Sequence, residues 1–277
     1  MATYYWVLGT GTWDNSNTAN WSTSSGGLGA AGPPTSADDV IFDNGSDVAG
    51  AIFTVTLGTG WACADMTASG LDNTMTWAGS TAGTIFGSMS LPATNFSRTM
   101  TAALTFGATA TGKTITCNGN TFASAITFNG VGGGWTLQDA FTTTGAWALT
   151  NGAFNANNFS VTVLSVAYTG SSTRTLATGT ADWIITGNAA TVFSAATQTN
   201  LTITGSKVFK FTYSGSTGTR TITPGAPAEG DACNLYVTAG SDTFARSNAS
   251  VTTGAFVLTG FTGTLNFAHN ATKIFYG

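Results

Sequence analysis

The residues that could carry acid–base chemistry are few and scattered along this 277-residue chain. Its single histidine, His269, lies between Ala268 and Asn270, with no serine or cysteine motif nearby that a base could activate. A catalytic base also needs a partner that orients it. We therefore interpret His269 as a structural or surface residue.

Carboxylates offer a second route to catalysis, because glycoside hydrolysis uses two acids that flank the scissile bond. Residues 51–277 hold seven acidic residues, which are Asp65, Asp72, Asp139, Asp182, Glu229, Asp231 and Asp242. Glu229 and Asp231 would share one face of a strand, but the preceding Pro227 indicates a turn with solvated charges. Asp139 and Asp182 border apolar strands, where turn capping explains them. We therefore predict no enzyme activity.

The densest group of oxygen ligands is near the N-terminus and consists of Asp38, Asp39, Asp43, Asn44 and Asp47. Oxygen-rich loops can hold calcium, but this spacing does not match an EF-hand loop. Asp and Asn recur wherever a chain turns between strands, so local turn capping is the prediction. No metal and no other cofactor is expected.

The three cysteines, Cys63, Cys117 and Cys233, are 54 and 116 residues apart and form no CxxC pair. With one histidine in the chain, a zinc site has almost no ligands available. An odd number of cysteines also argues against a secreted disulfide scaffold. We interpret all three as small buried apolar residues.

Three tryptophans of the N-terminal segment, Trp6, Trp13 and Trp21, are the candidate contact residues. Their flat faces could stack on sugars or on a partner protein. The alternative is that they seal the end of a core, because each aromatic side chain can bury about 150–250 Å².

The elements that position these residues must be strands. Only 7% of the residues are charged, against about 25% in ordinary soluble domains, and the chain has one Glu and four Lys, so long helices are excluded. Its 18 Phe, 8 Trp and 6 Tyr exclude intrinsic disorder. A net charge of −4 makes nucleic acid an unsuitable partner.

Short Thr-rich strands recur at intervals of 20 to 27 residues in two interleaved series. The proposed strand centres are Ile115, Thr136, Val161, Ile184, Phe209, Tyr236 and Val257 in one series, and Thr127, Ala148, Thr175, Thr202, Ile222, Phe244 and Asn266 in the other. Residues 168–179 also resemble residues 213–225, with Arg174 and Arg220 about two steps apart. A repeat of this length without helices predicts a parallel β-solenoid (β-helix), with an antiparallel β-sandwich or jelly roll as the alternative.

This pattern divides the chain into an N-terminal cap or anchoring segment, residues 1–50, and a solenoid, residues 51–277. Inward positions of the solenoid take apolar side chains, outward positions take Thr and Ser, and Gly and Asn occupy corners with left-handed backbone angles. Residues 273–277 look like the start of another strand. We expect either a partner subunit or further chain to cover that end.

Two stretches resemble a known family. Residues 4–22, with Trp6, Trp13 and Trp21, and residues 34–43, with Asp38 and Asp39, resemble the opening of Gly/Thr-rich β-helical virion proteins of tailed bacteriophages. A related residue pattern occurs in autotransporter-type adhesin repeats, and residues 126–159 resemble the strand–turn units of long fibres. The resemblance implies a capsid decoration protein or a tail fibre component, and it transfers no catalytic residues.

The leading hypothesis is therefore a non-enzymatic virion protein that contacts other capsid or tail proteins, forms a homo-oligomer and touches a host-surface glycan. The N-terminus lacks a secretory signal, and no apolar stretch reaches about 18 residues, so we expect no membrane span and assembly in the host cytoplasm. A bacterial surface adhesin passenger is the first alternative. A polysaccharide-degrading β-helix enzyme is the second.

Overall fold

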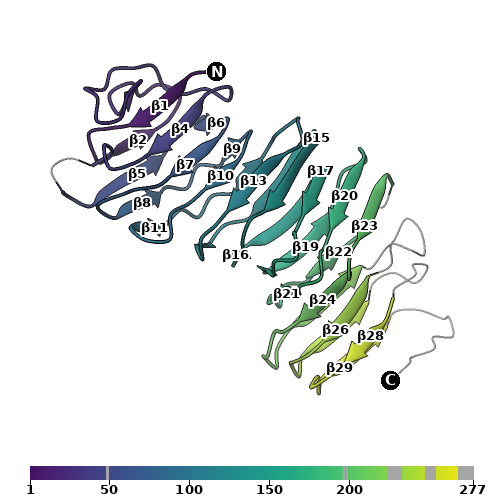
Figure 1. Ribbon diagram of the computed structural model, residues 1–277. Coiled ribbons are helices and arrows are strands. Elements are labelled where there is room, and N and C mark those ends of the chain that lie inside the picture. The colour runs from purple at the N-terminus through teal and green to yellow at the C-terminus, as the bar shows by residue number, and fades with distance from the viewer. Residues whose placement is uncertain (48–49, 196, 198, 224–232, 247–253, 268–277) are drawn as a thin grey trace.

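The computed structural model describes residues 1–47, 50–195, 197, 199–223, 233–246 and 254–267. Within these ranges every regular element is a β-strand, and none is a helix. The strands wind into a parallel β-solenoid of about nine turns, with β1 (Thr3–Trp6) and β28 (Phe256–Leu258) near opposite ends of the stack (Figure 1). The predicted solenoid is confirmed. The sandwich alternative is wrong, because among the described pairings only β1 (Thr3–Trp6) with β3 (Trp21–Ser22) is antiparallel.

Each coil has three faces, which we name A, B and C in the order in which the chain visits them. Face A contains β2 (Gly11–Trp13), β5 (Phe53–Leu57), β8 (Met75–Ala78) and β11 (Phe96–Arg98), then β14 (Thr121–Phe122), β16 (Phe141–Thr143), β18 (Val161–Val163), β21 (Trp183–Ile185), β24 (Val208–Phe211), β26 (Asn234–Val237) and β28 (Phe256–Leu258). Face B contains β6 (Ala62–Cys63), β9 (Gly83–Ile85), β12 (Leu104–Phe106), β19 (Ser165–Tyr168), β22 (Phe193–Ser194), β25 (Thr219–Thr223), β27 (Thr243–Arg246) and β29 (Thr264–Phe267). Face C contains β1, β4 (Asp39–Phe42), β7 (Met66–Ala68), β10 (Met89–Ser90), β13 (Lys113–Thr116), β20 (Arg174–Ala177) and β23 (Leu201–Thr204).

Two long strands, β15 (Ile126–Leu137) and β17 (Ala146–Asn155), continue around the corner from face B to face C. The first half of β15 pairs with β12 and its second half with β13. This continuity joins faces B and C into one 18-stranded sheet, whereas face A forms separate sheets of four and seven strands.

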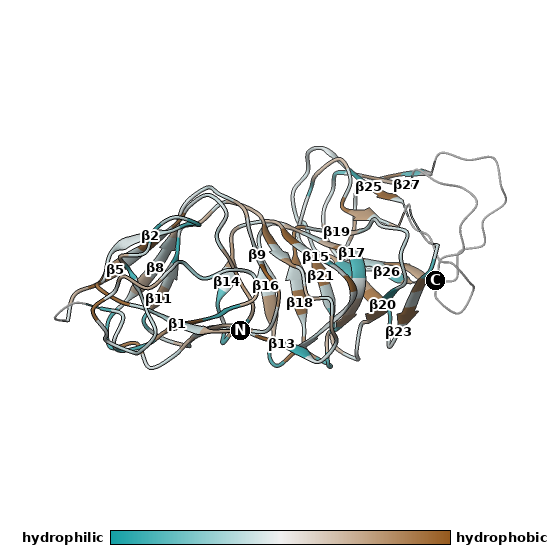
Figure 2. Ribbon diagram, turned by 90° about the horizontal axis from the view of Figure 1, so that it is seen from above, coloured by the Kyte–Doolittle hydropathy of each residue, from teal (hydrophilic) through white to brown (hydrophobic). Residues whose placement is uncertain are grey.

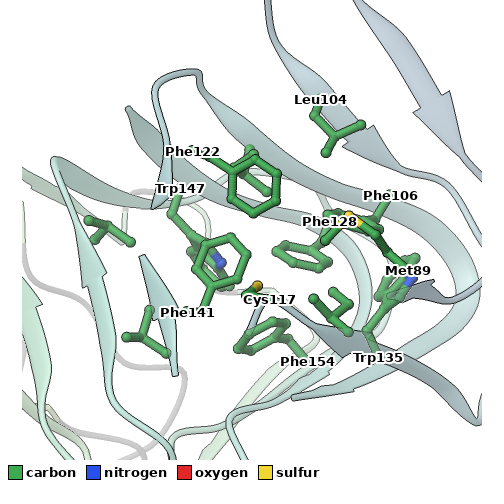
Figure 3. Close-up of a cluster of buried hydrophobic side chains, with 14 of the residues drawn as sticks. Met89, Leu104, Phe106, Cys117, Phe122, Phe128, Trp135, Phe141, Trp147 and Phe154 are labelled. Atoms are coloured by element: carbon green, nitrogen blue, oxygen red, sulfur yellow. The ribbon is translucent and has the colours of Figure 1, made fainter. Parts of the chain in front are cut away.

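The core runs along the inside of the coils, because alternate residues of each strand point inward. In β5 the inward residues Phe53, Val55 and Leu57 are buried, while Thr54 and Thr56 face outward. Figure 3 shows rings from successive coils gathered in the middle of the stack. Phe106 and Phe128 lie one coil apart with their ring centroids 5.0 Å apart. The predicted pattern of apolar residues inside and Thr outside is thus confirmed.

The corners use the residues predicted for them. Asn95, Asn118 and Asn157 adopt φ values of 59°, 49° and 50°, in the left-handed region that Asn tolerates better than most residues. Each side chain donates a hydrogen bond to a main-chain oxygen of the preceding coil, at 2.7, 2.7 and 3.0 Å. These asparagines therefore both turn the chain and tie neighbouring coils together.

The predicted period was right, but each predicted series mixed two faces. Thr127 and Ala148 are direct partners on face B. Thr175, which follows them in that series, lies in β20 on face C and pairs with Ala153. Likewise Arg174 lies on face C and Arg220, in β25, lies on face B. The similarity between residues 168–179 and 213–225 therefore does not correspond to two whole turns of the solenoid. Coils of unequal length and corners without loops cause this mixing, since neither is visible in strand spacing alone.

The parallel ladders also begin earlier than the boundary between residues 50 and 51. Within residues 1–50, β2 pairs in parallel with β5, and β4 pairs in parallel with β7. The N-terminal segment thus contributes strands to the first coil as well as the loops that cover it (Figure 1).

Candidate functional site

The three candidate contact residues, Trp6, Trp13 and Trp21, are completely buried. Trp21 meets Trp6 edge to face at a centroid distance of 5.0 Å and Trp13 at 5.4 Å. Because the rings pack on one another and on Phe42, they have no surface for a sugar or a partner. The predicted surface contact is therefore corrected: these tryptophans seal the core, as the alternative interpretation held.

Side chains of the N-terminal loop satisfy main-chain groups at this end of the stack. Asn17 donates from Nδ2 to the carbonyl oxygen of Thr12, in β2, at 2.5 Å. The buried Asn20 donates from Nδ2 to the carbonyl oxygen of Val7 at 3.0 Å and accepts a bond from Asn17. Amide side chains thus replace part of the strand pairing that a further coil would supply.

The acids of the first coils form a ladder at the corner between faces B and C. Asp39 accepts the backbone N–H of Asp65 at 3.1 Å, and Asp65 accepts that of Ser88 at 2.7 Å. The Ser88 hydroxyl continues the ladder by accepting the N–H of Thr114 at 3.1 Å. The carboxylates of Asp39 and Asp65 therefore lie on adjacent coils, and each accepts a hydrogen bond from the main chain of the next coil. Their role here is structural.

Other acids of the oxygen-rich segment also cap the backbone. Asp38 accepts the N–H of Ala2 at 2.8 Å and that of Thr35 at 3.1 Å, while Asp43 accepts the N–H of Gly45 at 2.9 Å. Burial raises the pKa of Asp38, but these hydrogen bonds outweigh it and leave the pKa below its usual value. Turn capping is thus confirmed at Asp38 and Asp43.

At Asp47 the carboxylate accepts a hydrogen bond from the Asn73 side chain. Among the described residues, no three His, Cys, Asp or Glu side chains are grouped as metal ligands.

Asp139 and Asp182 have different roles. Asp139 accepts the N–H groups of Cys117 and Asn118 in the preceding coil, which confirms the predicted turn cap. Asp182 instead forms an ion pair with Lys210 of the next coil at 2.6 Å, and both side chains are partly exposed. Both acids are thus engaged with a neighbouring coil.

Cys63, Cys117 and Cys233 are buried, as predicted, and none of them forms a disulfide. Burial, with a smaller contribution from the nearby carboxylate of Asp139, raises the pKa of Cys117 to about 12, and burial raises that of Cys63 as well. The thiols of Cys63 and Cys117 therefore stay protonated near neutral pH and are poor nucleophiles. The candidates His269, Glu229 and Asp231 lie outside the described residues, as do residues 273–277.

An ion pair that sequence reasoning missed lies inside the C-terminal coils. Arg220 donates from Nε and Nη2 to the two carboxylate oxygens of Asp242, both at 2.8 Å, and neither side chain is exposed. The rings of Tyr213, Phe244 and Phe261 lie within 5.8 Å of the guanidinium carbon. A signal was present in the sequence, since Arg220 alternates with the inward Ile222 along β25.

A partly buried arginine, Arg98, bridges the break in face A. The ladder of β11 does not continue into β14, and Arg98 of β11 donates from Nη2 to the carbonyl oxygen of Thr121 in β14. Its guanidinium also lies 4.5 Å from the centroid of Phe122. Burial lowers the pKa of Arg98 to about 10, so it remains charged near neutral pH.

A hollow with a volume of roughly 500 Å³ lies beside the N-terminal segment. Residues 33–36 form one wall, and the loop and strand residues of β6 and β9 form the floor. Pro33 and Pro34 have no N–H to give to a ladder, so this segment crosses the face B position of the first coil without forming a strand. The hollow is the consequence of that missing pairing.

The lining of this hollow is neutral. Its residues are Asn15, Pro33, Pro34, Thr35, Ser36, Gly60, Trp61, Ala62, Ala82, Gly83, Thr84 and Phe86. None of these twelve is an acid, a base, a histidine or a cysteine, so the lining provides groups for binding and none for proton transfer or nucleophilic attack. Strand spacing and motifs do not reveal this site, because its lining comes from four separate segments, residue 15 and residues 33–36, 60–62 and 82–86.

No described helix is long and apolar enough to cross a membrane. Comparison of the chain with protein-family models, with curated proteins and with solved structures found no match.

Proposed function

We propose that this chain is a non-enzymatic structural protein of a virion, either a capsid decoration protein or a tail fibre component. The observation that carries the proposal is how the carboxylates of the described coils are used. Asp39, Asp65 and Asp139 accept backbone N–H groups, and Asp182 and Asp242 pair with cations. Acids committed in this way hold coils together and leave no free pair for catalysis.

Three further features support a passive building element. The main chain forms parallel ladders from coil to coil, the outward surface of the strands is rich in Thr, and the N-terminal end is closed by its own side chains. In such a stack each coil contacts only its neighbours, so its stability is built up coil by coil. The resemblance of the N-terminal residues to virion proteins then selects the virion among the structural roles.

The first test is to find the protein in its assembly. Mass spectra of purified particles from the cells that encode it should contain its peptides, and antibodies to residues 1–47 should label the particles. Its absence from particles together with labelling of intact cells would overturn the proposal and favour the adhesin alternative.

The second test concerns catalysis. The purified protein should leave capsular polysaccharides and alginate unshortened after prolonged incubation. Chain shortening that is lost in an Asp65→Asn or Asp182→Asn variant, but retained in Asp72→Asn, would contradict the non-enzymatic role. Asp72 serves as the control because it was among the scattered acids and belongs to neither the corner ladder nor an ion pair.

A further inference from the structure

We propose that the neutral hollow between residues 33–36 and strands β6 and β9 is a binding site for an uncharged oligosaccharide. This inference deepens the proposed function, on which it rests, by naming the place and the ligand class of a surface contact. The hollow of roughly 500 Å³ falls within the range of about 300–1,000 Å³ that is usual for small-ligand sites.

One wall of the site is an aromatic platform. Phe86 keeps 37% of its surface exposed, whereas most large apolar side chains of the described coils are buried. A Cβ atom on Gly107 would come within 3.1 Å of the Phe86 ring, so the ring lies against the bare backbone of the next coil. This support holds the ring in place, and a sugar presents a C–H face that packs well on such a surface.

The floor of the site is equally constrained. The indole Nε1 of Trp61 donates to the carbonyl oxygen of Thr81 at 3.0 Å, which fixes the ring under the hollow. Any side chain at Gly83 would collide with that ring. The floor is therefore pre-organised, which lowers the entropy that a ligand would lose on binding.

Polar groups line the remaining surface and carry no charge. Asn15, Ser36 and Thr84 supply one amide and two hydroxyls, groups that both donate and accept hydrogen bonds. Thr35 is held by Asp38, whose carboxylate accepts both its N–H and its hydroxyl. Sugar hydroxyls need this mixture of neutral donors and acceptors beside an apolar face, whereas anionic ligands need cations that the lining lacks.

An extended peptide suits the site less well. A peptide that adds a strand needs a continuous row of backbone N–H and C=O groups. Here β6 has only two residues, and the opposite wall contains Pro33 and Pro34, which have no N–H to donate. The groups that are present are side-chain hydroxyls, an amide and a ring, so the saccharide is the better fit.

The test is saturation-transfer NMR and titration calorimetry on the full chain. The probes are maltotriose, cellotriose, mannotriose and chitotriose as neutral sugars, with sialyllactose, heparin fragments and a polyvaline-rich peptide as competitors. We expect a neutral probe to bind, with saturation transfer to its ring protons. Phe86→Ala should weaken binding about tenfold or more through loss of the platform, and Phe86→Trp should retain it.

Val131→Ala is the matched control, because Val131 is an apolar side chain 62% exposed and it is not among the residues that line the hollow. Its affinity should equal that of the unmodified chain. Circular dichroism and thermal unfolding verify that the Phe86 variants remain folded. Failure of every neutral probe, equal binding by Phe86→Ala, or binding of the peptide or anionic probes alone would overturn the assignment.

The outcomes also separate this inference from the proposed function. A protein that occurs in particles but binds no neutral probe keeps its structural role and loses the saccharide site. If the protein binds a neutral probe through Phe86 but is absent from particles, the saccharide site is supported and the proposed virion role is overturned.

Discussion

The N-terminal and C-terminal coils fill the same kind of core in two different ways. Five of the eight tryptophans lie in residues 1–77, all of them buried, whereas no tryptophan follows Trp183. The C-terminal coils instead enclose Arg220 and Asp242 among phenylalanine rings. The contrast teaches that the core of a coil can be filled either by large rings or by a charge that is paired with its counter-ion.

The two regions differ in charge as well. Residues 1–97 contain seven Asp and neither Lys nor Arg, whereas residues 98–277 contain all eight Lys and Arg against five acidic residues, a formal charge of +3. In the first coils, Asp38, Asp39 and Asp65 are stabilised by backbone N–H groups. In later coils cations do this work at Asp182 and Asp242. Aspartate is thus stabilised by backbone N–H groups in the first coils and by paired cations in the later coils.

The ends of the described structure differ too. Asn17 and Asn20 close the first coil with hydrogen bonds. In the last described coil, Leu258 is 41% exposed, and Phe256 and Phe261 are only partly buried. These residues are therefore less completely buried than Trp6, Trp13 and Trp21 of the first coil.

The largest effect is expected from Trp77→Ala in the N-terminal cluster. Trp77 contacts Trp13, Phe42, Trp61 and Phe96, with ring centroids 5.6 to 6.4 Å away. Loss of these contacts should cost near the upper end of the roughly 3–5 kcal/mol typical of Trp→Ala, measured by urea unfolding. Leu28→Ala, at a side chain 96% exposed, should change stability by less than about 0.5 kcal/mol. Equal costs would show that the buried tryptophan cluster does not stabilise the N-terminal coils.

Next in size is Asp242→Asn in the C-terminal coils. This change leaves the Arg220 charge buried without its counter-ion and should cost about 3 kcal/mol in urea unfolding. The double variant Arg220→Met with Asp242→Leu removes both charges and should recover most of that loss. If the double variant is as unstable as the single one, the apolar filling of the N-terminal coils is not interchangeable with the ion pair.

A smaller effect is expected at the junction between the two face A sheets. Arg98→Met removes the bond to Thr121 and the contact with Phe122, and should cost about 1–2 kcal/mol. Hydrogen exchange should quicken in β11 and β14 more than elsewhere. Lys113→Met is the control, since its ion pair with Asp65 is 3.7 Å long and partly exposed, and should change little. Unchanged exchange at β11 and β14 would show that Arg98 does not couple the two sheets.

The smallest effect is a pH dependence confined to the N-terminal segment. The hydrogen bond from the backbone N–H of Ser16, assisted by that of Asn17, lowers the pKa of Asp14 and outweighs the opposing effect of burial, and the pKa of Asp38 is lowered too. A lowered folded-state pKa stabilises the fold above the unfolded value of about 3.9, and this contribution is lost as pH falls through the folded value.

Thermal unfolding of the unmodified chain and of Asp38→Asn provides the measurement. The unmodified chain should have the higher midpoint at pH 7, and the difference should shrink as the pH falls below the unfolded pKa of about 3.9 and through the lower folded pKa. A difference that grows in acid would contradict the assigned role of Asp38.

Much of this architecture could be predicted from residue types. The shortage of charge, the Thr-rich strands and the recurrence every 20 to 27 residues led to a parallel solenoid, and the cysteines, corner asparagines and capping acids such as Asp139 lie where their chemistry suggests. These features depend on local propensity and on the alternation of side chains along a strand, which the sequence records directly.

Side-chain partners between coils had to come from the tertiary structure. The sequence shows Trp6, Trp13 and Trp21 as rings without saying whether they face solvent, and it shows Arg220 and Asp242 as distant charges. The hollow beside Phe86 likewise depends on Pro33 and Pro34 crossing above a strand that lies 28 residues further along the chain, from Pro34 to Ala62. Burial and contact depend on how much chain each coil uses before it closes, and only the folded stack fixes that length.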